Sequence, residues 1–163
     1  MSSEHIDLPS YSCDLIVAAS SVHWFDLDAF YAECKRLLKP DGRIAVWTYT
    51  WPDCNNKSLN EQLELIKKDL GPFWTKESLL HLNHYKELLF PFSMIKSPSF
   101  HFSVKWDIDQ LLNFLSTWAC IKNYIIEYDK NFIQNAHQKL SAFFEKDEKF
   151  LFYFPLYMKC GKL

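Results

Sequence analysis

Glycine is scarce in this chain of 163 residues, which contains only Gly42, Gly71 and Gly161. None of the three belongs to a G-x-G pattern, and none opens a predicted strand–helix unit. A loop that cradles a dinucleotide needs closely spaced glycines, because its backbone must approach the ligand and donate N–H groups to it. The sequence therefore argues against a nicotinamide-dependent dehydrogenase.

Long apolar runs and an N-terminal leader are also missing. The nearest candidate for a membrane span, residues 150–158, contains Pro155 and has about half of the roughly 20 residues that a span needs. The start of the chain, residues 1–5, is polar and lacks the basic and apolar regions of a signal peptide. We therefore expect a cytoplasmic protein that makes no use of a membrane.

Neither sign of charge dominates, since 18 Lys and Arg face 20 Asp and Glu, for a formal net charge of −2. Binding to phosphates normally leaves a basic footprint, so nucleic acid is not expected as a partner. The five cysteines form no C-x-x-C pair, which is typical of reduced thiols in the cytosol. Aromatic residues are plentiful at 17%, and they either fill a core or line a pocket.

The stretch from Cys13 to Asp53 predicts a parallel β-α-β unit. Residues 15–19 are a continuous apolar run, which favours a strand buried on both faces. Asp26 stands at the N-cap position of a helix with one apolar stripe. Residues 40–42 predict a tight turn, and residues 44–47 predict the second buried strand. Strands joined in this way form a right-handed crossover.

Further elements are expected in the rest of the chain from the period of its apolar residues. The expected helices are 59–70, 76–88, 107–115 and 133–145, and the expected strands are 100–104 and 150–158.

The stretch from Cys13 to Asp53 resembles the second half of the catalytic domain of a class I S-adenosylmethionine-dependent methyltransferase. The resemblance includes the strand led by Asp14, the loop Ser21–Phe25 and the helix exit Leu37–Gly42. Later motifs point to the methyltransferase type 11, trans-aconitate-methyltransferase-like branch. These motifs are Gly71–Trp74, His84–Tyr85, Phe90–Phe92 and Leu115–Trp118.

This resemblance implies an α/β fold with an incomplete doubly wound, Rossmann-like sheet, an antiparallel last strand and a helical cap. Residues 1–163 would form a single partial methyltransferase domain. Within it, residues 1–53 would end the cofactor-binding half, and residues 54–163 would supply the substrate-side helices and C-terminal strands. Because the resemblance begins near the family's third strand and the glycine-rich loop is lacking, we expect a chain truncated at its N-terminus.

Doubly wound folds bind ligands beyond the carboxyl ends of their strands. By resemblance, the loop after the first strand runs along the methionine part of S-adenosyl-L-methionine, and residues near the start of the chain pass its adenine. A disordered start is the alternative for residues 1–12. The implied cofactor-binding residues are Ser3, Glu4, Ala19, Ser20 and Val22.

Two neighbouring residues of this loop are candidates for the acceptor side. His23 is a candidate base for an acceptor hydroxyl, since histidine titrates near pH 6.5. Alternatively, His23 only shapes the loop, and we prefer this interpretation because a carboxylate acceptor is already ionised and needs no base. Trp24 is the stronger candidate, as a pocket wall, and an aromatic face also stabilises a sulfonium.

Other residues have two possible roles each. Trp118 and Tyr124 either line the acceptor pocket, as the resemblance implies, or pack in the core. His81, His84 and Glu87 are spaced so that one helix face could bind a metal, but an ordinary helix surface is the preferred interpretation, and we predict no metal.

Two functions remain open from the sequence. The first is S-adenosylmethionine-dependent methyl transfer to a small molecule, with a carboxylate as the acceptor that the resemblance implies. The second is a non-catalytic fragment or protein-binding remnant that does not bind the cofactor on its own. In either case the strand over residues 15–19 lacks a neighbour on one side, so self-association through an exposed sheet edge is expected.

Overall fold

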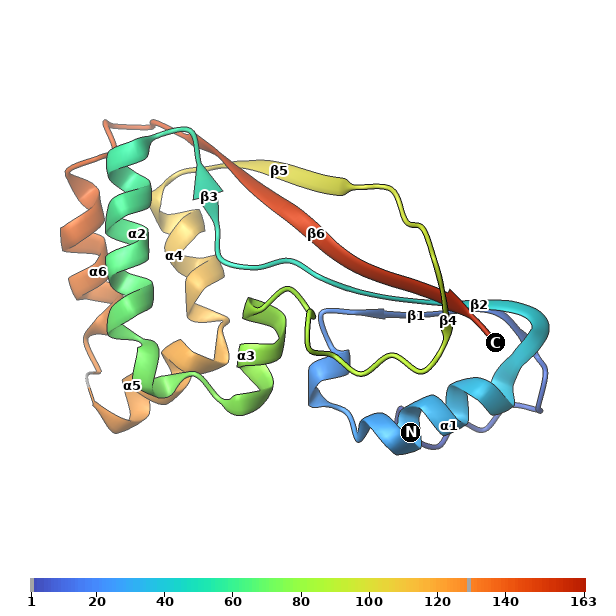
Figure 1. Cartoon of the computed structure of the whole chain (residues 1–163). Helices are drawn as coiled ribbons and strands as arrows, with labels where there is room; N and C mark the ends of the chain where they lie inside the picture. The colour runs from blue at the N-terminus through green and yellow to red at the C-terminus, as the bar shows by residue number, and fades with distance from the viewer. Residues whose placement is uncertain (1, 129) are drawn as a thin grey trace. The chain divides into compact units, whose positions relative to one another are not determined.

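The computed structural model describes residues 2–128 and 130–163, which divide into two compact units (Figure 1). The first unit contains residues 1–50, 80–100 and 155–163, and the second contains residues 51–79 and 101–154. No helix within the described residues is long and apolar enough to cross a membrane. The prediction of a single domain over residues 1–163 stays a prediction.

A small sheet with helix α1 against it forms the first unit. Strand β1 pairs in parallel with β2, β2 pairs antiparallel with β6, and β6 pairs antiparallel with β4 (Figure 1). The predicted α/β fold and the antiparallel last strand are therefore confirmed. The elements of this unit are β1 (Cys13–Ala19), α1 (Leu27–Leu37), β2 (Leu38–Thr48), β4 (Ser93–Ile95) and residues 155–162 of β6 (Phe150–Lys162).

Helix α1 begins where its sequence predicts. The Asp26 side chain accepts a hydrogen bond of 3.2 Å from the backbone N–H of Ala29, which caps the helix. The apolar stripe of the helix, including Phe30 and Cys34, is buried in a core shared with Ile44 of β2. This packing on one face of the sheet stabilises the β-α-β unit.

The predicted turn over residues 40–42 is instead an irregular part of β2. Cys13 pairs with Leu38 while Leu15 pairs with Arg43, so the four residues 39–42 stand opposite the single residue Asp14. A Cβ atom on Gly42 would lie 2.9 Å from the backbone oxygen of Lys39, so the close approach of the backbone requires glycine there.

Burial of β1 on both faces was wrongly predicted. Ile16 and Ala18 pack against the core, but Leu15 and Val17 are 58% and 53% exposed on the opposite face. The apolar run predicted two covered faces, whereas the described helices and loops of this unit bury the face that bears Ala18. Strand β1 also stands at the end of the sheet order, as expected from the sequence.

Helices form most of the second unit, together with short stretches of paired strand. The expected helices and strands are present, although α6 ends at Ser141 instead of residue 145, and α5 is an additional helix that the apolar pattern did not indicate. The elements are β3 (Asp53–Cys54), α2 (Lys57–Asp69), α3 (Lys76–Leu82, whose last turn belongs to the first unit), β5 (Phe100–Trp106), α4 (Ile108–Ser116), α5 (Ala119–Glu127), α6 (Phe132–Ser141) and the start of β6.

Helix α3 is shorter than predicted, ending at Leu82 instead of residue 88. His84 and Tyr85 have positive φ angles of 59° and 55°, a left-handed backbone that cannot continue a helix. The side chain of Tyr85 is thereby turned into the first unit, where it is fully buried.

Candidate active site

The carboxyl ends of the parallel strands β1 and β2 define the candidate site. A loop leaves β1 at Ser20, whose backbone N–H donates to the carbonyl of Trp47 on β2 at 2.8 Å. Ser20 has a positive φ of 47°, and its hydroxyl oxygen is buried without a hydrogen-bond partner among the described residues. A strained backbone and an unsatisfied polar atom are typical of a ligand-binding loop.

A short 3₁₀ helix, Val22–Trp24, carries the two acceptor-side candidates. Val22 is fully buried in the core and fixes this turn of backbone. His23 is also buried, at 7% exposed, whereas Trp24 is 51% exposed with its ring centroid 5.2 Å from that of His23. The surface of this loop is therefore formed by the indole, and the imidazole lies behind it.

His23 belongs to a buried polar cluster. Its Nδ1 atom lies 2.8 Å from the hydroxyl oxygen of Tyr85, a residue 62 positions away in the chain. The ring centroid of His81 lies 4.9 Å from that of His23, and His81 is 8% exposed. The loop after β1 is thus joined to the end of α3 and the segment that follows it.

Two members of this cluster, Tyr85 and His81, are uncharged near neutral pH. Burial raises the pKa of Tyr85 to about 12, opposed by a hydrogen bond with the Thr48 hydroxyl. Burial lowers the pKa of His81 to about 4, and the charge on a protonated His23 lowers it further. Both groups are therefore neutral over the usual working range, as expected for polar groups removed from water.

The first residues of the chain lie along α1. A carboxylate oxygen of Glu4 accepts from the backbone N–H of Asp26 at 3.3 Å, and Glu33 accepts from the N–H of Ile6 at 2.8 Å. Arg36 donates to the carbonyl of Ile6 and to Glu33, and this guanidinium, with the Ile6 N–H, lowers the pKa of Glu33 to about 2. The described part of this segment is therefore anchored, and a disordered start is not what the structure shows.

Trp118 and Tyr124 belong to the second unit. The ring of Trp118 lies 5.4 Å from Trp51 and 5.7 Å from Trp74, and the ring of Tyr124 lies 4.8 Å from Phe73. These nearly perpendicular contacts favour core packing. Their role in an acceptor pocket stays a prediction.

The histidines that suggested a metal site do not share a helix face, because α3 ends before His84. His84 instead stacks on Tyr157 of β6, with ring centroids 3.7 Å apart. Within the described residues, no group of three or more His, Cys, Asp or Glu side chains could hold a metal ion.

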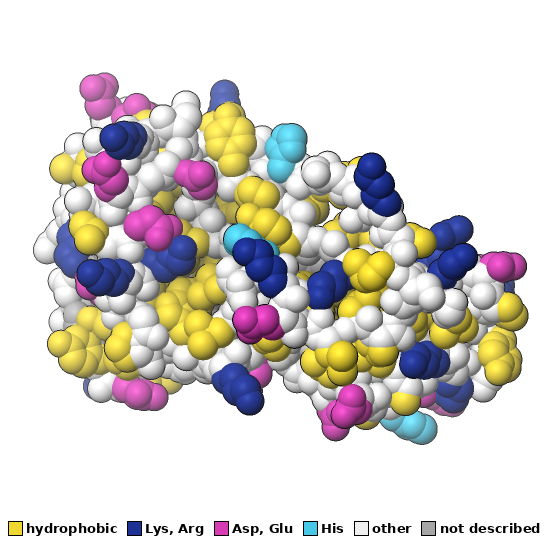
Figure 2. All heavy atoms as spheres, in the orientation of Figure 1, with side chains coloured by type: hydrophobic (Ala, Val, Ile, Leu, Met, Phe, Trp, Pro, Cys, Tyr) yellow, Lys and Arg dark blue, Asp and Glu magenta, His cyan; other side chains and the backbone are white. Residues whose placement is uncertain are grey.

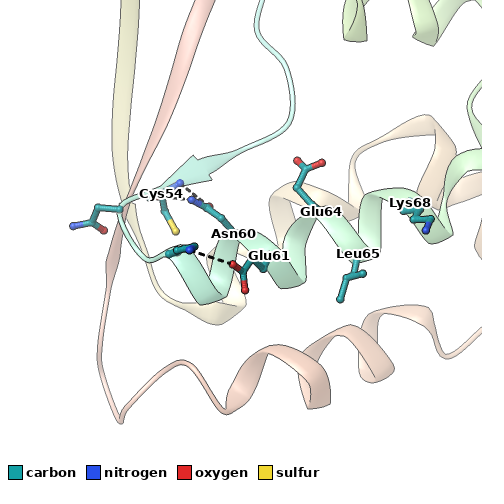
Figure 3. A pocket seen from close by; sticks show the side chains of 8 residues that line it. Cys54, Asn60, Glu61, Glu64, Leu65 and Lys68 are labelled. Carbon is teal, nitrogen blue, oxygen red and sulfur yellow. Dashed lines mark hydrogen bonds and ion pairs between the residues drawn. The ribbon is translucent and has the colours of Figure 1, made fainter.

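A separate groove of about 770 Å³ follows α2 in the second unit (Figure 3). Figure 3 shows that Asn60 lies beside Cys54, whose backbone N–H donates to the Asn60 side chain at 2.9 Å. The groove is also lined by charged side chains on the surface of α2, namely Glu61, Glu64 and Lys68. Figure 2 likewise shows positive and negative side chains interspersed over the face that it presents.

Sequence reasoning missed Tyr85 and Thr48 as members of the His23 cluster. The pair His84–Tyr85 was noticed as a motif, but nothing local indicates that its backbone turns left-handed and sends a phenol to His23. The contact is set by tertiary packing over a long sequence separation.

Comparison with known proteins agrees with the predicted resemblance. Residues 1–46 match the methyltransferase domain family. A candidate methyltransferase of Dictyostelium discoideum is 27% identical over 169 residues, covering 98% of this chain. A candidate type II methyltransferase from Anaeromyxobacter dehalogenans has a similar structure, with a TM-score of 0.85 and 25% identity over 98% of this chain. The chain spans 63% of the length of the first relative and 68% of the second.

Proposed function

We propose that this chain, which is related to the class I methyltransferases, carries the acceptor-facing part of an S-adenosylmethionine-dependent methyltransferase for a small carboxylate. The observation that supports the proposal is the loop Ser20–Trp24 at the carboxyl ends of β1 and β2. It combines a buried hydroxyl that lacks a partner with an exposed indole. In doubly wound folds this is where ligands bind.

The chain's own residues would contribute alignment more than proton transfer. The cofactor supplies a methyl group on a sulfonium, which is a very good leaving group. Ala19, Ser20 and Val22 would hold its methionine part, with Ser3 and Glu4 toward the adenine. Trp24 would wall the acceptor and exclude water, and a carboxylate acceptor would need no base.

The fit to the cofactor is partial. The Ser20 hydroxyl offers a buried polar atom to a ligand, but the sequence provides no G-x-G loop to cradle one. This incomplete fit favours the alternative for the polypeptide by itself, namely a non-catalytic chain that does not hold the cofactor without further sequence.

Titration of S-adenosylmethionine into this 163-residue chain is expected to give weak or no heat of binding. The physical reason is that the backbone donors of a glycine-rich loop are not supplied by its three glycines. Isothermal titration calorimetry is the measurement, with S-adenosylhomocysteine as a second probe. Micromolar or tighter binding would mean that residues 2–24 form a sufficient site, and would remove the non-catalytic alternative.

In a chain extended upstream by a strand and a glycine-rich cofactor loop, as the resemblance implies, Trp24→Ala is expected to lower methyl transfer far more than His23→Ala. Loss of the indole wall misaligns the acceptor and is expected to cost about 100-fold in turnover. Loss of one neutral hydrogen bond at His23 is expected to cost about fivefold.

Transfer of label from methyl-labelled S-adenosylmethionine to a panel of small carboxylic acids is the measurement. The same panel with alcohols serves as the control for acceptor type. A His23→Ala enzyme that keeps cofactor binding yet loses nearly all turnover would reverse the ranking and indicate a hydroxyl acceptor.

A further inference from the structure

In the short hydrogen bond between His23 and Tyr85, either Nδ1 of His23 or the hydroxyl oxygen of Tyr85 could be the donor. Nδ1 of His23 and the hydroxyl oxygen of Tyr85 are 2.8 Å apart, and both residues are buried. In a neutral imidazole one nitrogen is a donor and the other an acceptor. Whether the partner of Nδ1 donates or accepts therefore decides whether Nε2 carries the hydrogen.

Tyr85 is the better donor of the two. A phenol O–H is more acidic than an imidazole N–H, and an unprotonated imidazole nitrogen accepts more strongly than a phenol oxygen. Burial also keeps Tyr85 protonated, since it raises the pKa of the phenol to about 12. The distance of 2.8 Å suits an O–H donor. The hydrogen is thus expected to lie on Tyr85 and to point to Nδ1.

We propose that Tyr85 is a positioning residue that holds His23 in the tautomer protonated at Nε2. The consequence for catalysis rests on the proposed function: with Nδ1 engaged by Tyr85 and Nε2 protonated, His23 would have no nitrogen left to accept a proton and would not act as a base. His81 also lies at the His23 ring, with its centroid 4.9 Å away. His81 is neutral at pH 7 because burial lowers its pKa to about 4, so it adds no charge.

The tautomer can be read directly from the ¹⁵N spectra of the histidine side chains at about pH 8, where an ordinary imidazole is neutral. A His23→Gln variant assigns the signals. In the unmodified chain we expect hydrogen on Nε2 alone. In Tyr85→Phe, Nδ1 loses its donor, and a measurable share of the Nδ1-protonated tautomer is expected.

Tyr31→Phe is the matched control, because it removes another buried phenol in the same unit. Tyr31 is 2% exposed, and its hydroxyl has no hydrogen-bond partner in the described structure. Its removal is expected to leave the His23 signals unchanged. An unchanged tautomer in a folded Tyr85→Phe chain would overturn the proposal.

The unmodified chain decides the matter even where Tyr85→Phe does not fold. Hydrogen on Nδ1 of His23 would overturn the proposal whatever the activity of the protein. The measurement needs neither cofactor nor acceptor, so a failure to find methyl transfer to carboxylates would contradict the proposed function and leave the tautomer assignment standing.

Discussion

Replacing His81 with phenylalanine is expected to reduce the acid sensitivity of this protein's folding between about pH 6.5 and pH 4. Burial lowers the pKa of His81 from 6.5 to about 4 in the folded state. As the pH falls below 6.5, the unfolded chain binds a proton that the folded chain does not accept until about pH 4. The free energy of unfolding therefore decreases across this window and levels off below it.

The shift corresponds to at most about 3 to 4 kcal/mol, since one pKa unit is about 1.4 kcal/mol. That is a large share of the roughly 5–15 kcal/mol that stabilises a typical domain. Urea unfolding at a series of pH values is the measurement. His81→Phe keeps a ring of similar size but cannot bind a proton, so its curve is expected to be flatter over this window.

His137→Phe is the matched control, because His137 is half exposed on α6, where its side chain is 47% accessible. It is expected to keep the slope of the unmodified chain. Glu33 affects folding stability in a lower pH range. Its pKa is about 2 in the folded state, so its contribution is lost only as the pH falls below the ordinary carboxyl value of about 4.5. An acid slope that persists undiminished in His81→Phe would show that His81 is already protonated in the folded protein.

Local signals predicted α1 and the strands beside it well. The Asp26 cap, the stripe that includes Phe30 and Cys34, and the apolar run over residues 44–47 each specify one element and the face it buries. The capping box at Asp107 and Gln110 likewise marks the start of α4. These features lie within one or two turns of chain, so no tertiary information is needed to read them.

The site depends on contacts that local patterns do not encode. The position of His23 and Trp24 after a strand was predictable, but which of the two is buried was not. That is decided by Tyr85, whose left-handed backbone brings it to His23 from a distant segment. The open face of β1 was missed for a similar reason: an apolar run shows what a strand can bury, not which layers are present to cover it.

The open face and edge of β1 lead to the second expectation, that copies of this chain associate with one another. Strand β1 pairs only with β2 among the described residues, so its other edge presents backbone N–H and C=O groups. Leu15 and Val17 add exposed apolar surface to the same strand. A second copy offers the same edge, and antiparallel pairing of two β1 strands would satisfy both edges and bring Leu15 and Val17 of the two copies side by side on one face.

Sedimentation velocity over a range of concentrations tests this proposal with Leu15→Lys and Val17→Lys combined. Like charges brought together across two paired strands are expected to weaken association at least about tenfold, or about 1.4 kcal/mol. The double variant should then sediment as the 19.4 kDa monomer where the unmodified chain is larger.

Leu65→Lys is the control, because Leu65 on α2 is 53% exposed but belongs to no strand, and it should associate like the unmodified chain. An unmodified chain that stays monomeric at every concentration would mean that this edge is protected, and equal association of the double variant would place the contact elsewhere on the surface.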